Sequence, residues 1–226
     1  MQVIVLADGA VGSRDAIDAA WPGWLTPGAA IVAADGGARH ASGLRLPIDR
    51  WVGDGDSLGE DEIAELVAAG IPVDRVPADK DQSDTELAIL AALERSATAI
   101  AILGALGGPR IDHALANLTL LSMPALAGVD VRLVAADARV RLLRAPTAAG
   151  SPVSVEMDGR VGDLVSLLPV GDDAVGISTA GLAYPLDDET LLDGLTRGLS
   201  NRRTAPTARV TLGAGRLLVV ETPATL

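Results

Sequence analysis

The sequence predicts an α/β domain with a mainly parallel, doubly wound sheet, followed by a smaller all-β, sandwich-like domain. In the first two thirds of the chain, short apolar runs alternate with amphipathic segments. These runs are apolar on both faces, which is typical of strands buried on both sides of a parallel sheet. Strand–helix alternation is typical of doubly wound folds. Beyond residue 145 only short strand-like runs follow. We therefore expect domains at 1–145 and 146–226.

The first domain is expected to contain six strands, at 2–7, 29–34, 51–52, 73–76, 99–104 and 129–136. Segments with helical spacing between them predict helices at 60–69, 83–96 and 112–123. The helix at 83–96 opens with a capping-box pattern, in which Ser83 is the N-cap and Glu86 reaches back.

The second domain should follow a connector at 144–152 that is rich in Pro, Gly and Ala. The runs VSVEM, LVSLLPV and GISTAGL predict strands, and 186–195 predicts a loop or helical turn. The run ARVTLGAGRLLVVE predicts two more strands joined as a hairpin at Gly-Ala-Gly.

Composition restricts the function. The 226-residue chain has a net charge of −12 and no cysteine. Acidity argues against nucleic acid, which needs a basic face; it suits metal cations or a cationic small molecule, or serves solubility alone. Lack of cysteine excludes disulfides and thiolate metal sites. No leader or membrane-spanning run is recognisable, so we expect a soluble, cytoplasmic protein.

Polar residues gather directly after four predicted strands, at junctions that share the carboxyl edge of a parallel sheet, where ligands bind. Turn and capping chemistry explains any one group alone, but not their common position. We therefore expect a single site. Its residues are Asp35, Gly36 and Gly37; Asp54 and Asp56; Lys80, Asp81 and Asp84; and Gly107, Gly108, Arg110 and Asp112. The three tryptophans, Trp21, Trp24 and Trp51, are expected to pack in the core.

This set of residues suits a metal and a polyphosphate. Mg²⁺ is usually held by one or two carboxylates together with substrate phosphates, and an arginine fork binds phosphate oxygens. Neither a P-loop nor a G-x-G-x-x-G motif after a strand is present. The residues alone therefore predict Mg²⁺-dependent chemistry on a phosphorylated nucleotide, either transfer or hydrolysis.

Six motifs resemble, in order, those of the thiamine pyrophosphokinases, which transfer a pyrophosphoryl group from ATP to the hydroxyl of thiamine and release AMP. They are ADGGA at 34–38, GDGDS at 53–57, DKDQSDTELAI at 79–89, GALGGPRIDHALANL at 104–118, GLAYPL at 181–186 and GLSN at 198–201.

The resemblance implies a role for each matching residue. Asp54, Asp56 and Asp84 would hold Mg²⁺ and, with Arg110 and Asp112, act in catalysis. ATP and its phosphates would be bound by Asp35, Gly36, Gly37, Lys80, Asp81, Gly107, Gly108, Arg110 and Asn117. Thiamine would be bound by Tyr184, Ser200 and Asn201, contributed by the β domain of the other subunit of a homodimer.

Two positions depart from the family pattern. Gly55 stands where a bulkier apolar residue is usual, and Ser83 stands where Thr is frequent. Two alternatives stay open. The chain could act on another alcohol, such as a hydroxymethylpterin, or it could be a non-catalytic module that binds thiamine diphosphate or a nucleotide.

Overall fold

A computed structural model describes residues 1–145 and 151–224. The chain divides into two compact units, Met1–Ala136 and Asp137–Leu226. The division falls earlier than the boundary at 145/146 that the sequence suggested, because Arg139–Ala145 forms strand β7 and pairs along its length with β14, Gly215–Thr222. The expected connector at 144–152 therefore begins within β7, and its residues 146–150 lie outside the described ones.

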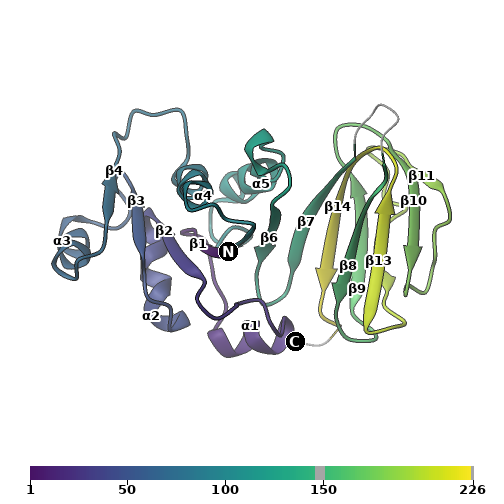
Figure 1. Ribbon diagram of the computed structural model, residues 1–226, viewed down its shortest axis with the longest axis horizontal. Helices are drawn as coiled ribbons and strands as arrows, with labels where there is room; N and C mark the ends of the chain where they lie inside the picture. The colour runs from purple at the N-terminus through teal and green to yellow at the C-terminus, as the bar shows by residue number, and fades with distance from the viewer. Residues whose placement is uncertain (146–150, 225–226) are drawn as a thin grey trace. The chain divides into compact units, whose positions relative to one another are not determined.

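The first unit is built on a six-stranded parallel sheet with the strand order β4-β3-β2-β1-β5-β6. Strands β4, β3, β2 and β1 follow one another in Figure 1. This confirms the mainly parallel α/β domain. Each predicted strand is present within two residues of its expected ends, since apolar residues on both faces mark them clearly in the sequence. The bounds are β1 Gln2–Leu6, β2 Ala30–Ala34, β3 Arg50–Gly53, β4 Val73–Arg75, β5 Ala99–Leu103 and β6 Asp130–Val134.

Helices cover both faces of this sheet. One face of β1, with Ile4 and Leu6, packs with α1 and α2. Val3 and Val5 point to the opposite face and are fully buried, and α4 lies along β1, β2 and β3. The bounds are α1 Arg14–Ala20, η1 Asp35–Arg39, α2 His40–Leu44, α3 Glu60–Ala68, α4 Asp84–Glu94, α5 Ile111–Leu120 and η2 Pro124–Leu126.

The sequence predicts α3, α4 and α5 but not α1 and α2, which span seven and five residues and are too short to show a helical period. The Ser83 hydroxyl accepts a hydrogen bond from the backbone N–H of Glu86 at 3.2 Å, so Ser83 caps α4 as expected. All three tryptophans are at most 4 % exposed, so they belong to the core.

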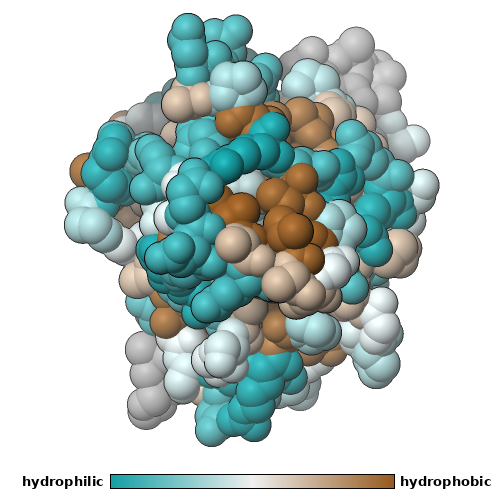
Figure 2. Space-filling view, turned by 90° about the vertical axis from the view of Figure 1, so that its left-hand side faces the viewer, coloured by the Kyte–Doolittle hydropathy of each residue, from teal (hydrophilic) through white to brown (hydrophobic). Residues whose placement is uncertain are grey.

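Strand β4 is the edge strand of the first unit. It is only three residues long, and Asp74 pairs with Arg50 of the neighbouring β3. Figure 2 looks onto this end of the unit and shows an apolar area bordered by hydrophilic side chains. A short, charged edge strand resists pairing with another chain.

The second unit is a sandwich of two antiparallel sheets, ordered β12-β9-β14-β7 and β11-β10-β13-β8. Val165, Leu167 and Val219 of the first sheet share one core with Ile177 and Val210 of the second. This confirms the expected all-β domain. The remaining bounds are β8 Val153–Asp158, β9 Leu164–Pro169, β10 Ala174–Ala180, β11 Glu189–Leu191, β12 Asn201–Arg202 and β13 Thr207–Leu212.

The predicted hairpin at Gly-Ala-Gly is wrong. Strands β13 and β14 flank this turn, but β13 pairs with β8 and β10 whereas β14 pairs with β7 and β9. The chain crosses between the sheets at Gly213–Ala214, where both backbone N–H groups donate to the carbonyl of Val175 at 3.0 Å. Residues 186–195 form a loop, one of the two expected alternatives, and the loop also contains the short strand β11.

A buried ion cluster joins strands of the second unit. The Glu221 carboxylate is 1 % exposed and lies 2.8 Å from Arg139 Nε, 2.5 Å from Arg203 Nη2 and 3.6 Å from Arg141 Nη2. Burial raises the pKa of Glu221, but the three guanidinium groups outweigh it and the pKa is lowered.

Across the described part of the chain, no helix has the length and apolar character needed to cross a membrane.

Candidate active site

A cavity of about 480 Å³ opens in the first unit at the carboxyl edge of its sheet. Strand β1 pairs with β2 on one side and with β5 on the other, so the cavity lies at the point where the chain changes winding direction, the usual ligand site of such sheets. Its walls are the segments 7–9 after β1, 34–35 after β2, 104–110 after β5 and 82–85 at the start of α4. The edge predicted from the sequence therefore does form a cavity.

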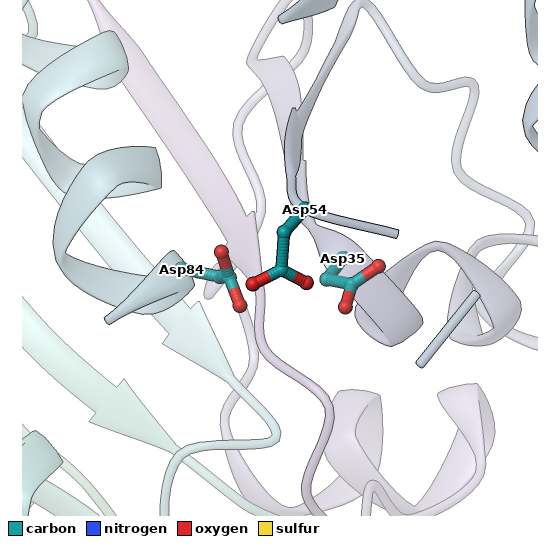
Figure 3. A group of neighbouring side chains, drawn as sticks. All are labelled: Asp35, Asp54 and Asp84. Carbon is teal, nitrogen blue, oxygen red and sulfur yellow. The ribbon is translucent and has the colours of Figure 1, made fainter. Parts of the chain in front are cut away.

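Three carboxylates converge at this edge (Figure 3). Asp35 follows β2, Asp54 follows β3 and Asp84 opens α4, and each places an oxygen within 4.8 Å of the others. Asp84 Oδ1 is buried, and the Lys80 ammonium lies 3.1 Å from it. Three converging carboxylates beside one ammonium group suit a hard cation, for which carboxylate oxygens are the preferred ligands. We call these residues the acidic triad.

Lys80 lies among the carboxylates of the triad. Its Nζ is 2.6 Å from Asp54 Oδ2 and 3.1 Å from Asp84 Oδ1. The hydrogen bond from Lys80 lowers the pKa of Asp54, whereas burial raises the pKa of Asp84. Burial lowers the pKa of Lys80, but the hydrogen bond to Asp54 and the charge of Asp84 outweigh it, so the pKa is raised. Lys80 therefore stays charged and offsets part of the repulsion between the carboxylates.

Asp35 is held rigidly. It is 2 % exposed, and it adopts a positive φ of 41°, which is uncommon for a non-glycine residue. The Trp51 indole donates to its carbonyl at 3.0 Å, and the backbone N–H groups of Ser57 and Leu58 donate to its carboxylate at 3.1 and 3.3 Å. Burial raises its pKa to about 6, helped by the neighbouring Asp56.

Asp56 and Asp81, both predicted at the site from the sequence, lie outside the triad. Asp56 is exposed; its backbone N–H donates to Asp54 Oδ1 at 3.1 Å, and its carboxylate accepts from the Ser57 hydroxyl at 3.2 Å. Asp81 is exposed and does not line the cavity. Asp56 lies next to Asp35. The metal role expected for Asp56 and the phosphate role expected for Asp81 stay predictions.

Arg110 and Asp112 form an exposed bidentate pair at the start of α5. Arg110 Nε lies 2.9 Å from Asp112 Oδ1, and Arg110 Nη2 lies 2.5 Å from Asp112 Oδ2. The hydrogen bonds from Arg110 hold the pKa of Asp112 well below its usual range. Arg110 lines the cavity, but Asp112 does not. Asn117 lines it as well, and its buried amide donates to the Ala105 carbonyl at 3.0 Å, which fixes the loop after β5.

The glycines of the site make room for neighbouring loops. A Cβ on Gly104 would lie 2.1 Å from the carbonyl oxygen of Ala7, and one on Gly37 would lie 2.0 Å from that of Leu6. At Gly107 and Gly108 the nearest atoms, 3.0 and 3.3 Å away, belong to the loop after β1. These contacts account for the glycines without a ligand, so their expected phosphate role stays a prediction.

Gly55, which departs from the family pattern, has a φ of +85°. A Cβ there would lie 2.6 Å from Ile63 Cδ1 and 3.0 Å from Arg75 Nη2. Side chains from α3 and β4 therefore occupy the space that a larger residue at this position would need.

The residues expected to bind thiamine lie in the second unit. Tyr184 is 72 % exposed. Asn201 is buried and clamps the backbone of Tyr184, accepting from its N–H at 3.0 Å and donating to its carbonyl at 2.6 Å. Ser200 has a positive φ of 57°, and its backbone N–H donates to Ser166 Oγ at 3.0 Å.

Sequence reasoning missed several residues that line the cavity. They are Asp8 and Gly9 after β1, Ser57 after β3, and Gln82 and Thr85 near the start of α4. A signal for the first pair exists, because Ala-Asp-Gly occurs at 7–9 and again at 34–36, both times directly after a buried strand. The cavity thus combines carboxylates suited to a metal with a lysine and an arginine suited to phosphate.

Comparison with known proteins agrees with this chemistry. Residues 25–133 match the family model described as "Thiamin pyrophosphokinase, catalytic domain", and residues 153–217 match "Thiamin pyrophosphokinase, vitamin B1 binding domain". The thiamine pyrophosphokinase of Bacillus subtilis (strain 168) is 27 % identical over 175 residues, which cover 77 % of this chain and 78 % of the relative.

Solved structures share the fold over the whole chain. The crystal structure of thiamine pyrophosphokinase from Bacillus subtilis superposes with a TM-score of 0.81 at 22 % identity, covering 99 % of each chain. A thiamin pyrophosphokinase family protein from Enterococcus faecalis gives a TM-score of 0.79 at 26 % identity, covering 98 % of this chain and 99 % of that one.

Proposed function

Because the chain belongs to the thiamin pyrophosphokinase family of enzymes, we propose that it transfers a pyrophosphoryl group from ATP to the hydroxyl of thiamine in a Mg²⁺-dependent reaction. The observation that carries this proposal is the acidic triad with Lys80 at the edge of the cavity.

The acidic triad would hold Mg²⁺, with Asp56 as a further ligand from the same loop as Asp54. When bound, the ion neutralises phosphate charge and orients the group that is transferred. The fit rests on the three converging carboxylates, whose negative charge the single Lys80 ammonium offsets only in part.

The chain's own cations would complete the phosphate site. Lys80 keeps its charge beside the triad, and Arg110 would leave Asp112 to bind phosphate oxygens with its planar fork. The thiamine hydroxyl oxygen forms a bond to the β-phosphorus of ATP, and the bond from that phosphorus to the α–β bridging oxygen breaks. AMP leaves, and the hydroxyl proton is released. Such a transfer needs mainly positioning and charge neutralisation.

Thiamine would be bound by Tyr184, Ser200 and Asn201 of the second unit, acting in a cytoplasmic homodimer in which each site uses residues of both subunits. The match of residues 153–217 to a vitamin B1 binding domain supports thiamine over another alcohol such as a hydroxymethylpterin.

The test is AMP release from ATP and Mg²⁺ with and without thiamine. We expect AMP and thiamine diphosphate in equal amounts only when thiamine and Mg²⁺ are both present, and loss of both products when EDTA is added. AMP without thiamine would indicate hydrolysis, and a folded protein that binds thiamine diphosphate or nucleotide without releasing AMP would indicate a binding module.

A further inference from the structure

Asp8 is a charged residue of the cavity without a role in the chemistry described above. It follows β1 directly, at the point where β1 separates β2 from β5. Its side chain is exposed, and the residue lines the same cavity as Asp35 and Asp84.

Asp8 makes no side-chain hydrogen bond or ion pair with any described residue. The pKa of the nearby Arg39 is raised mainly by Glu62, with a smaller contribution from the charge of Asp8. The Arg39 guanidinium itself donates hydrogen bonds to Glu62 and to the carbonyl of Ser57. The other charged groups of the site have close protein partners: Asp54 and Asp84 with Lys80, Asp35 with the backbone N–H groups of Ser57 and Leu58, and Arg110 with Asp112.

The position of the Asp8 carboxylate depends on Gly36. A Cβ at residue 36 would lie 2.4 Å from Asp8 Oδ1 and 2.8 Å from Asp8 Oδ2, too close for both groups to stay in place. Gly36 has no positive φ that would call for glycine. The glycine therefore keeps a space that the Asp8 carboxylate fills.

A carboxylate repels phosphate, so at this cavity Asp8 suits a hydrogen-bond donor or a cation and not a phosphate oxygen. With the phosphates of a nucleotide at the acidic triad, its nucleoside part would lie in the rest of the cavity, which has the volume of a small-molecule site. A ribose offers two neighbouring hydroxyl donors that match two carboxylate oxygens, and acidic residues bind ribose in this way at the edges of other α/β sheets.

We propose that Asp8 accepts hydrogen bonds from the ribose hydroxyls of ATP and thereby selects ribonucleotides over deoxyribonucleotides. This specificity role rests on the proposed function.

The test measures kcat/KM for ATP, 2′-deoxyATP and 3′-deoxyATP with wild type, Asp8→Asn and Asp8→Ala. Wild type should prefer ATP over either deoxy form by about 10- to 100-fold, the range expected for a hydrogen bond to a charged group. In Asp8→Ala the preference should fall to about twofold or less, because the acceptor is gone. Asp172→Asn is the matched control, since Asp172 is exposed in the second unit and makes no side-chain hydrogen bond with a described residue; it should keep the wild-type preference.

A second variant tests the geometry. In Gly36→Ala the methyl group should displace the Asp8 carboxylate and lower the sugar preference, and adding Asp8→Ala to it should lower the preference no further. Calorimetry with AMP and 2′-deoxyAMP provides a readout that does not need turnover. It separates failure of the proposed function, in which AMP is not produced, from failure of the sugar contact.

Equal preference in wild type and folded Asp8→Ala would overturn the proposal. So would an Asp8→Ala variant that needs more Mg²⁺ but keeps the sugar preference, because Asp8 would then contact a cation. If Asp8→Ala does not fold, as judged by circular dichroism, Asp8→Asn decides: it keeps the shape but loses the charge, and its preference should fall at least about threefold.

Discussion

Lys80 and the acidic triad set the electrostatics of the site at the scale of single residues. Three carboxylates this close repel one another, and the Lys80 ammonium group forms ion pairs with Asp54 and Asp84. Burial of Asp35 raises its pKa to about 6 and outweighs the backbone hydrogen bonds that its carboxylate accepts, which lower the pKa. A divalent cation would remove the remaining repulsion, so we expect changes in the triad to act through the metal.

The first prediction concerns Asp54. Asp54→Asn removes the charge that Lys80 contacts and one oxygen of the triad, so turnover should fall at least about 100-fold, since a metal contributes several kcal/mol to such reactions. Mn²⁺ affinity, measured by calorimetry, should fall as well. We expect the same loss for Asp56→Asn if it is a ligand. Asp61→Asn, in the exposed first turn of α3, is the control. Folded Asp54→Asn with near-normal AMP production across a Mg²⁺ titration would exclude the metal role.

Arg110 gives the second prediction. A bidentate fork is not replaced by a point charge, so Arg110→Lys should lower kcat/KM for ATP by about 10- to 100-fold while thiamine binding without ATP stays similar. Arg132→Lys is the matched control, because Arg132 pairs with Asp130 two residues away, as Arg110 does with Asp112. An unchanged dependence of the rate on ATP would show that Arg110 does not bind phosphate.

At the scale of elements, the loops after β1 and β5 form one rigid wall of the cavity. The backbone N–H of Gly9 donates to the Gly104 carbonyl at 2.9 Å, and that of Ala7 donates to the Leu103 carbonyl at 2.8 Å. The loops touch backbone to backbone, which only residues without a side chain permit.

Gly104→Ala tests this wall. Gly104 has a φ of +74°, and an added Cβ would lie 2.1 Å from the Ala7 carbonyl. Gly28 has a φ of +79° with nothing within 4 Å of an added Cβ, so Gly28→Ala carries only the backbone cost of about 1–2 kcal/mol. Gly104→Ala should lower the free energy of unfolding by about 1–3 kcal/mol more, as measured by urea denaturation followed by tryptophan fluorescence. If Gly104→Ala and Gly28→Ala lower the free energy of unfolding equally, the loops after β1 and β5 can move apart without cost.

Elements differ in how well the sequence predicts them, for physical reasons. The strands of the parallel sheet are apolar on both faces, and α4 has a clear N-cap at Ser83, so the sequence predicts both kinds of element. Helix α2 has only five residues, too few to show the helical periodicity of apolar residues. The Gly-Ala-Gly turn has hairpin composition, yet pairing is decided by the distant strands β7 and β9. Asp8 was missed because its position depends on Gly36, which follows a different strand, β2.

At the scale of the whole molecule, stability and assembly can be examined in each unit separately. All three tryptophans belong to the first unit, and the only tyrosine, Tyr184, belongs to the second. The buried Glu221 cluster belongs wholly to the second unit and links β7 and β14 with Arg203.

Glu221→Gln should destabilise the second unit by about 3–5 kcal/mol at pH 7, because it removes the carboxylate that three guanidinium groups share. The folded pKa lies below the unfolded value of 4.5, so this stabilisation is present above pH 4.5 and is lost as pH falls through the folded pKa. Urea denaturation followed by far-UV circular dichroism should therefore show that the free energies of unfolding of wild type and Glu221→Gln become more similar as the pH falls below 4.5. Glu156→Gln is the control; its pair with Arg209 is exposed and should contribute at most about 1 kcal/mol. A difference in free energy of unfolding between wild type and Glu221→Gln that stays constant down to pH 3 would contradict the role of Glu221.

The proposed shared site predicts complementation. Asp54→Asn and the double variant Tyr184→Ala/Ser200→Ala should each be nearly inactive as homodimers. After subunit exchange, a heterodimer holds one intact site and one doubly altered site, so activity should return to at most about half of the wild-type value. Size-exclusion chromatography should show dimers throughout. Exchange of mass-tagged chains without recovered activity would place the whole site in one subunit.

The central position of β14 in its sheet has a consequence for synthesis on the ribosome. β14 is the last described strand in the sequence, yet it pairs with both β7 and β9. All strands of the first unit precede residue 137, so that unit can fold while translation continues, whereas the second must wait for its final strand. A nascent or truncated chain that lacks β14 leaves β7 and β9 with open edges, and such edges recruit other chains. Chaperone demand during synthesis should therefore come from the second unit.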